Sequence, residues 1–456
     1  MDITIAYIGG GSQHWAPVMM QDLALTEGLG GRLNLYDINH QRACANAHMG
    51  SAIFSHSEAR SRFQVEAHED LAETLRGADI VFISILPGPM TCFANDLDIP
   101  LRHGIVQTVG DTTGPGGLSR SLRTVPMFQH FARAIAEHCP QAWVINYTNP
   151  MTVATQSLLS EAPHLKVIGC CHEVFACRSW IGMMAAKYTG IPIAHRNEVD
   201  VELVGLNHFT FFPRASYKGH DVWPAIAAWI EDQANAQGDY WRDRTQDALA
   251  REAKGRYGSC DGLIQLDYWR RFGVFGAAGD RHLVEFVPWY CQSVERLRRW
   301  GVSVTGSAQR LGNWVPDNVE TRPKNPESLK RSKEEGIDLV QCLVGQRSMV
   351  TNVNVANRGQ IPWLPQGHVV ETMATVDRDR VTPHMAGELP LGLQSHVRRI
   401  ADVQQLTLSA ALNCDREAAL HALLADPLCH LDTDAAVQLL DDLVAANAEW
   451  LPAAWR

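Results

Sequence analysis

Short apolar runs rich in β-branched residues recur through the first third of the chain, and stretches of helical length separate several of them. The runs cover residues 3–8, 33–36, 80–85, 142–145 and 167–168. Amphipathic stretches cover residues 18–29 and 120–138. Strands that alternate with helices form a parallel sheet with helices on both faces. The sequence therefore predicts a doubly wound α/β domain, with its ligand at the carboxyl ends of the strands.

The pattern changes after about residue 195. Residues 198–206 alternate charged and apolar side chains like a half-buried strand, tryptophan-rich helical stretches follow, and Pro and Asn interrupt residues 310–326. Residues 404–450 carry Ala and Leu at helical spacing, which predicts packed helices. We therefore expect two domains, residues 1–195 and 196–456, the second of α+β structure.

The composition excludes several classes of partner. The 456 residues include 50 acidic and 40 basic ones, a formal charge of −10, so we expect no nucleic-acid partner and no anionic membrane surface. No apolar stretch approaches the roughly 20 residues of a membrane span, and the first residues lack a basic, cleavable leader. The 11 cysteines contain no C-x-x-C pair, which argues against a secreted disulfide framework. We expect a cytoplasmic protein.

A glycine-rich loop, from Gly9 through Gly11 to Ser12, follows the first predicted strand. Such a loop permits a tight turn and lets the N–H groups of the next helix meet a pyrophosphate. The next strand ends in Asp37, whose carboxylate can accept two hydrogen bonds from an adenosine ribose and repels a 2′-phosphate. These features predict NAD rather than NADP. His14 replaces the third glycine of the usual pattern, and a purely structural strand–turn–helix unit is the alternative.

Further motifs follow one another over most of the chain. They are residues 95–100 (NDLDIP), 112–117 (TTGPGG), 122–126 (LRTVP), 146–150 (NYTNP), 171–174 (CHEV), 205–208 (GLNH), 279–286 (GDRHLVEF), 368–371 (HVVE) and 422–427 (ALLADP). In the order and spacing of these motifs the chain resembles glycoside hydrolase family 4, whose members depend on NAD.

The resemblance implies a Rossmann-like N-terminal domain of the lactate/malate dehydrogenase type and a C-terminal domain for substrate, metal and oligomer contacts. It also implies an unusual reaction on a small sugar substrate. NAD oxidises the sugar C3 hydroxyl, a base removes the acidified C2 proton, the aglycone leaves by elimination, water adds, and the hydride returns. A divalent metal, manganese in the family, binds the C2 and C3 oxygens. The resemblance suggests a homodimer or homotetramer.

Two residues match the metal ligands of the family, Cys171 after the fifth predicted strand and His208 in Gly-Leu-Asn-His. A thiolate and a neutral imidazole leave coordination positions open for substrate oxygens, which suits a Lewis acid. From the residues alone, a buried inert cysteine is the favoured interpretation of Cys171, and a hydrogen-bonded core histidine is that of His208.

The residues around the metal motif have implied roles as well. Asn149 matches a contact to substrate and metal, although Asn-Pro is also a common turn. His172 follows the metal cysteine, where family members differ according to substrate, and is our candidate for protonating the leaving oxygen. Glu173 is its competitor and would need a raised pKa.

Two residues compete for the role of the base that removes the C2 proton. Asp261 and Tyr257 lie in a glycine-bounded segment where family members keep a base, and a plain turn is the alternative interpretation. A tyrosinate would need the metal and nearby cations to lower its pKa, so we favour Asp261 slightly.

Arg281 and His282 match an Arg-His pair of the family. The planar guanidinium of Arg281 suits a carboxylate on the sugar, with a structural salt bridge as the alternative. The Cys-His-Glu-Val motif is similar to that of the family members acting on α-linked uronic acids, notably α-galacturonidases. An α-glucuronidase or α-galactosidase of the same family remains open, as do a lactate/malate-type dehydrogenase and a non-catalytic NAD-sensing module.

Overall fold

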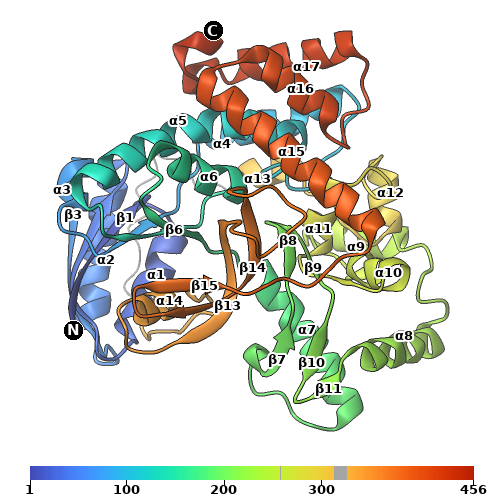
Figure 1. Ribbon diagram of the computed structural model, residues 1–456, viewed down its shortest axis with the longest axis horizontal. Helices are drawn as coiled ribbons and strands as arrows, with labels where there is room; N and C mark the ends of the chain where they lie inside the picture. Colours follow the sequence, from blue (N-terminus) through green and yellow to red (C-terminus); the bar gives the residue numbers. More distant parts are fainter. Residues whose placement is uncertain (257, 313–325) are drawn as a thin grey trace.

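The protein is described here by a computed structural model, in which residues 1–256, 258–312 and 326–456 are placed. In these residues the largest sheet has nine strands in the order β15-β14-β13-β6-β5-β4-β1-β2-β3 (Figure 1). Their bounds are β1 Asp2–Ile8, β2 Gly30–Tyr36, β3 Arg62–His68, β4 Ile80–Ile83, β5 Trp143–Asn146, β6 Lys166–Gly169, β13 Met349–Ala356, β14 Val369–Asp377 and β15 Arg380–Pro383.

The first six strands form the doubly wound arrangement that the sequence predicts. They pair in parallel in the order β3-β2-β1-β4-β5-β6, the strand order of a Rossmann fold. Strands β13–β15 extend this sheet in antiparallel fashion, although they come from the last third of the chain. The α/β fold class is therefore confirmed.

Alternation along β1 explains why both faces of the sheet are covered. Ile5 and Tyr7 pack with α1 (Trp15–Ala24), α2 (His40–Ser55) and α14 (Gly336–Leu343) on one face. Ala6 and Ile8 pack on the opposite face with α3 (Leu71–Leu75), α5 (Gly114–His138) and α6 (Met151–Glu161). A strand buried on both sides carries apolar residues at successive positions, as residues 5–8 do.

Two predicted helices differ from the structure at their ends. Helix α1 begins at Trp15 and ends at Ala24, so it starts and stops earlier than the predicted 18–29. Helix α5 begins at Gly114 rather than at residue 120, because Thr113 and Pro115 supply an extended N-cap and a proline in the first turn.

The prediction of one strand over residues 198–206 is wrong. Strand β7 (Val199–Val201) belongs to a sheet of order β11-β10-β7, and β8 (Val204–Leu206) belongs to a sheet of order β12-β9-β8. The alternation shows which side chains are buried, but it does not show which strands pair with one another. The sequence pattern therefore could not reveal that the chain passes from one sheet to another at Glu202 and Leu203. The other strands of these sheets are β9 Phe209–Phe212, β10 Ala215–Tyr217, β11 His220–Asp221 and β12 Phe275–Gly276.

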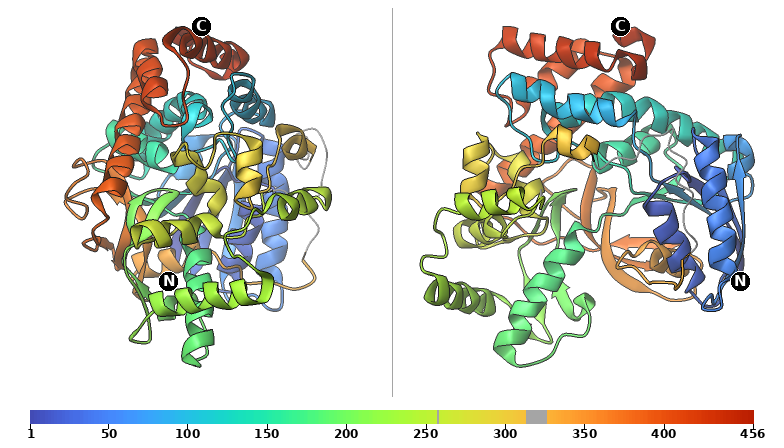
Figure 2. Two further views of the ribbon diagram at one scale, coloured as in Figure 1. Left: turned by 90° about the vertical axis from the view of Figure 1, so that its right-hand side faces the viewer. Right: turned by 180° about the vertical axis from the view of Figure 1, so that it is seen from behind.

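Helices complete the second half of the chain. Between β6 and β13 the chain forms, besides α14, the helices α7 Glu173–Thr189, α8 Trp223–Gln237, α9 Thr245–Ala253, α10 Leu263–Phe272, α11 Asp280–Leu283, α12 Val294–Arg299 and α13 Ser307–Gly312. At the C-terminus, α15 (Leu391–Asn413), α16 (Arg416–Ala425) and α17 (Thr433–Ala446) pack together as expected, against α4 (Met90–Arg102) and α5 (Figure 2).

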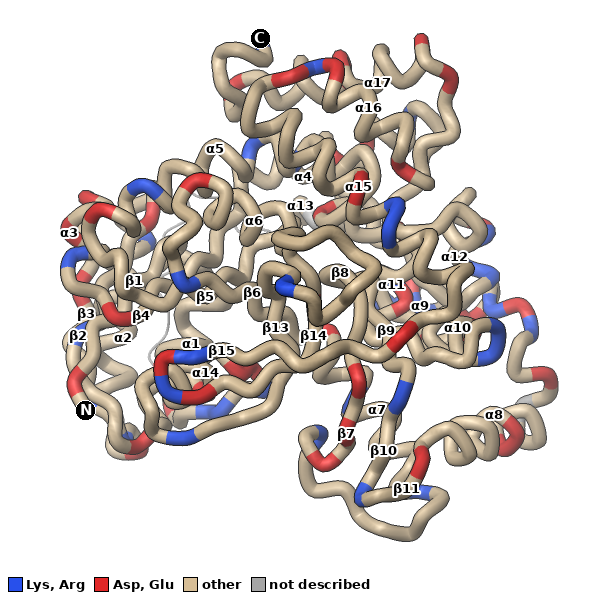
Figure 3. The backbone as a smooth tube through the Cα atoms, in the orientation of Figure 1, with Lys and Arg blue, Asp and Glu red and all other residues tan. Residues whose placement is uncertain are grey.

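Charged residues of both signs are interspersed over the helices and loops (Figure 3). None of the helices within the placed residues combines the length and the apolar character that crossing a bilayer requires.

Candidate active site

The loop after β1 is built for close approach to a ligand. Gly9 has a φ of +95°, and a Cβ there would overlap the carbonyl oxygen of Ser84. The N–H groups of Gly9 and Gly10 both donate to the Tyr36 carbonyl at 2.9 Å, which joins this turn to the end of β2. A side chain at Gly9 is therefore excluded, so only the backbone of this turn lies at the carboxyl end of β1.

Asp37 lies against the same loop. Its Oδ2 accepts from the Gly11 N–H at 2.9 Å, and its Oδ1 accepts from the Asn39 N–H at 2.9 Å. The hydroxyl of Ser12 accepts from the N–H of Trp15 at 3.0 Å, where α1 begins. Asp37 therefore lies directly beside the glycine-rich loop, at the end of β2.

A single large cleft joins this loop to the residues of the family motifs. Its volume is about 1170 Å³, and its lining residues run from Ile8 to Trp450 along the chain. That is slightly more than the roughly 300–1,000 Å³ of an ordinary ligand pocket, so the cleft has room for a dinucleotide and a sugar together. Gly9, Gly11, Ser12 and Asp37 line one part of it, and Asn149, Cys171, His172 and His208 line another.

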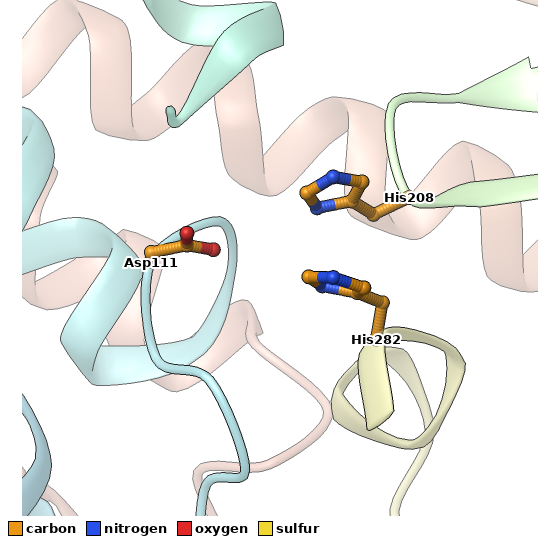
Figure 4. Close-up of side chains that lie close together, drawn as sticks. All are labelled: Asp111, His208 and His282. Carbon is orange, nitrogen blue, oxygen red and sulfur yellow. The ribbon is translucent and has the colours of Figure 1, made fainter. Parts of the chain in front are cut away.

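Asp111 and His208, which line the cleft, and the neighbouring His282 point toward one another (Figure 4). Their ligand atoms all lie within 4.8 Å of one another, and the two imidazole rings lie 3.9 Å apart between centroids. Asn149 donates through Nδ2 to Asp111 Oδ2 at 3.1 Å, and its own Oδ1 is buried with no hydrogen-bond partner among the placed residues. A buried oxygen without a donor is a position where a cation or a substrate hydroxyl fits.

The electrostatics of this cluster suit a cation. Burial and the neighbouring His282 lower the pKa of His208 to about 3, so its imidazole is neutral at pH 7. Burial alone would raise the pKa of Asp111, but Arg120, His208 and His282 hold it at about 2. The site thus offers an ionised carboxylate beside a neutral imidazole, the protonation states in which both bind a divalent metal.

Cys171 lies at the same cleft, two residues beyond the end of β6. Burial, together with Glu371 and Glu173, raises the pKa of its thiol well above the ordinary value. Its sulfur is not part of the Asp111–His208–His282 cluster. A divalent cation at this point would deprotonate the thiol outright.

His172 caps α7 and lines the cleft, and Glu173 begins that helix. Glu173 Oε2 accepts from the Gly279 N–H at 2.9 Å, while Oε1 lies 3.3 Å from Arg281 Nη2 and 3.4 Å from His282 Nε2. Burial would raise the pKa of Glu173, but His282 and Arg281 hold it well below its usual range. An ionised Glu173 cannot donate a proton, which favours His172 of the two candidates for the acid.

The structure does not bring Asp261 to the cleft. Asp261 forms an ion pair with Arg251, which also donates to the Gly301 carbonyl at 2.6 Å, and it is not among the placed residues that line the cleft. Its role as the base stays a prediction. Tyr257 lies outside the residues that the structure places.

Comparison with known proteins agrees with these features. Residues 4–186 match the sequence model of the family 4 glycosyl hydrolases, and residues 203–429 match that of their C-terminal domain. The chain belongs to glycosyl hydrolase family 4. The prediction of an enzyme of this family is therefore confirmed.

Similar family 4 members cover nearly the whole chain. An α-galacturonidase of Thermoanaerobacterium saccharolyticum is 38% identical over 99% of this chain and 97% of its own length. An α-galacturonidase of Bacillus subtilis is 39% identical over 97% of each chain. A crystal structure described as a putative glucosidase, LplD, from Bacillus subtilis is 37% identical, with a TM-score of 0.86 over 97% of this chain and 100% of that one.

Solved family 4 structures at lower identity share the fold. A 6-phospho-β-glucosidase from Thermotoga maritima, whose structure contains manganese, NAD⁺ and glucose 6-phosphate, is 21% identical with a TM-score of 0.74. The match covers 99% of both chains, so the two proteins share their fold over almost their whole length.

The prediction from sequence missed Asp111, which adjoins the quoted TTGPGG motif. The pattern that could have indicated Asp111 is the Gly-Asp pair directly before this motif, just ahead of the long buried helix α5. Arg120, which lines the cleft and donates through Nε to the Asn149 carbonyl at 2.9 Å, was missed because it reads as an ordinary helix residue.

Proposed function

We propose that this glycosyl hydrolase cleaves α-linked galacturonides, with NAD and manganese as its cofactors. The proposal rests on one observation, which is that the chain has a higher sequence identity to α-galacturonidases than to an α-galactosidase. Four α-galacturonidases are 36–39% identical over 93–100% of this chain, whereas the α-galactosidase of Bacillus subtilis is 28% identical.

The loop after β1 fits NAD. Gly9 and Gly11 leave backbone where a side chain would collide, and a Cβ at Gly11 would lie 2.7 Å from the Asp37 carboxyl carbon. Ser12 fixes the start of α1, whose N–H groups can meet a pyrophosphate. Asp37 would hold the adenosine ribose.

The buried cluster fits manganese. Cys171 and His208 are the proposed ligands, and Asp111 and His282 stand beside His208 with the charge and geometry of further ligands or substrate contacts. Asn149 would turn its unpaired Oδ1 toward the metal or the sugar. When bound, NAD supplies a hydride acceptor for the sugar C3, and the metal supplies a Lewis acid for the neighbouring oxygens.

The chain's own residues would perform the proton transfers. His172 at the cleft would donate a proton to the aglycone oxygen as the C1–O bond breaks, and Asp261 or Tyr257 would take the C2 proton. Arg281, whose side chain is 43% exposed beside Glu173, would pair with the substrate carboxylate, and His282 would contact the sugar.

Assembly and location complete the proposal. We infer a homodimer or homotetramer that acts in the cytoplasm on a small sugar substrate, in line with its family. The negative formal charge of −10 argues against a nucleic-acid partner.

The deciding assay compares aryl α-galacturonide, α-glucuronide and α-galactoside with NAD and Mn²⁺ present. We expect phenol release to be fastest from the galacturonide and to stop when the nucleotide is stripped or the metal is chelated. A preference for the galactoside would overturn the substrate assignment. Steady accumulation of reduced nicotinamide would instead support the dehydrogenase alternative.

A further inference from the structure

Two groups contact the His172 imidazole in ways that its proposed role does not require. The indole of Trp15 stacks on it, with ring centroids 5.8 Å apart and planes inclined by 28°. Glu334 Oε1 lies 3.6 Å from His172 Nδ1. The other ring nitrogen, Nε2, lies 3.9 Å from Glu173 Oε1. The ring is therefore approached on one face by an aromatic group and at Nδ1 by a carboxylate.

The loop that carries Glu334 is anchored on both sides. The Glu334 N–H donates to Ser332 Oγ at 3.0 Å, and the Ser332 N–H donates to Asp22 Oδ1 at 2.7 Å on α1. Glu335 accepts from Arg196 at 2.8 Å. The backbone at Glu334 is thus tied to the helix that also supplies Trp15, so the carboxylate and the indole keep a fixed relation around His172.

The position of the Glu334 carboxylate is unfavourable for the stability of the fold. Its side chain is 22% exposed, and its Oε2 is buried with no hydrogen-bond partner among the placed residues. A small cavity of about 20 Å³, lined in part by Trp15, Tyr147 and Glu334, lies beside it. A buried carboxylate oxygen without a donor is unfavourable, so packing alone does not explain this residue.

We propose that Glu334 is a positioning residue for His172. Its carboxylate attracts the Nδ1 side of the ring electrostatically across 3.6 Å, so that Nε2 carries the proton given to the leaving group, while Trp15 fixes the plane of the ring. The inference rests on the proposed role of His172 as the acid. In that step the proton passes from Nε2 to the aglycone oxygen, the C1–O bond breaks with its electron pair on that oxygen, and His172 becomes neutral.

The test uses α-galacturonides with a series of leaving groups, from 4-nitrophenol to simple alcohols, on the full-length enzyme with NAD and Mn²⁺ at one pH. Poor leaving groups need the proton and good ones do not. Glu334→Gln should lower kcat about 10- to 100-fold for the poorest leaving groups and less than about twofold for 4-nitrophenol, with KM little changed. Glu334→Asp keeps the negative charge but moves it away from His172, because the side chain is shorter. This variant should lower kcat for the poorest leaving groups by less than Glu334→Gln does.

Asp338→Asn is the matched control. Asp338 lies on α14 after the same loop, pairs with Arg331 at 2.9 Å and Arg347 at 3.2 Å, and should leave the dependence on the leaving group unchanged. If Asp338→Asn reproduced the selective loss, a general loosening of the loop would explain it and the positioning role would be overturned.

His172→Gln separates the two proposals. It should cause a larger loss of the same selective kind, and adding Glu334→Gln to it should cost nothing more. A selective loss for His172→Gln without one for either Glu334 variant would overturn the positioning role and keep the acid. An equal loss on every leaving group for His172→Gln would overturn the acid, and the inference with it.

Discussion

Arg281 is the residue on which the choice of a uronic acid depends. Its guanidinium lies 3.3 Å from Glu173 and is partly exposed, so it can pair with a second carboxylate. We expect Arg281→Ala to lower kcat/KM for a galacturonide about 10- to 100-fold, since a hydrogen bond to a charged group is worth about 1.5–3 kcal/mol. Kinetics with a galacturonide and a neutral galactoside measure the difference.

The control for Arg281 is Arg214→Ala, which removes an exposed arginine that pairs with Glu202 at 3.4 Å. This substitution should leave kcat/KM unchanged for both substrates. An equal loss on both sugars for Arg281→Ala would mean that Arg281 only holds Glu173 in place.

Two adjacent cysteines allow a matched test of the metal site. Cys170 and Cys171 are both buried and both line the cleft, but only Cys171 matches the family ligand. Cys171→Ala and His208→Ala should abolish turnover and weaken Mn²⁺ binding, measured by calorimetry with NAD-loaded enzyme, while the affinity for NAD stays close to normal. Cys170→Ala should keep the metal. Near-normal Mn²⁺ affinity in Cys171→Ala would contradict the ligand assignment.

At the scale of elements, the unit β1–loop–α1 contains two glycines with different tasks. Gly9 faces the Ser84 carbonyl after β4, whereas Gly11 faces the side chain of Asp37. Gly9→Ala should destabilise the fold by about 1–3 kcal/mol, because its φ of +95° is strained for alanine and backbone blocks the new methyl group. Gly11→Ala should displace Asp37 instead and weaken NAD binding more than stability.

Thermal unfolding and NAD titration of both variants distinguish these effects. Asp37→Ala serves as the reference, since it should weaken NAD binding and leave the Mn²⁺ site intact. A Gly11→Ala variant with normal NAD affinity would show that Asp37 can move aside without loss.

These elements also show what the sequence could reveal. The loop after β1 and Asp37 were predictable because strand, turn and helix follow one another locally, and the carboxyl ends of β1 and β2 must be neighbours once the sheet is parallel. Asp111 and Glu334 were not, because each lies in a loop that only long-range packing brings to His208 or His172. Asp261 sits in a segment that the resemblance marks, yet its ion pair with Arg251 depends on tertiary contacts that no local pattern encodes.

At the scale of the whole molecule, the two halves of the chain are interlocked. The family models divide it between residues 186 and 203, yet β13, β14 and α14 cover and extend the N-terminal sheet. Glu285, from the second half, accepts from the N–H groups of Thr108, Val109 and Gly110 at 2.6–3.0 Å, next to Asp111.

We therefore expect a fragment of residues 1–195 not to fold alone. It would expose apolar side chains such as Ile3, Phe82 and Ile168, which pack in one core with Leu339 and Val353. Circular dichroism should show no cooperative thermal transition for this fragment. Co-expression with residues 196–456 should restore soluble protein, and cooperative unfolding of the isolated fragment would contradict the prediction.

The interlocked halves place the nucleotide loop and His208 around one cleft, and this arrangement bears on the reaction itself. Oxidation at C3 makes the C2 proton acidic enough for a side chain to remove, whereas direct displacement at C1 never breaks that bond. Hydrolysis in deuterated water should therefore give a sugar with deuterium at C2, detected by mass spectrometry and NMR. Asp261→Asn should abolish the exchange together with turnover if Asp261 is the base, and Tyr257→Phe should do so if the tyrosine is. Product that keeps its protium at C2 would exclude the elimination route.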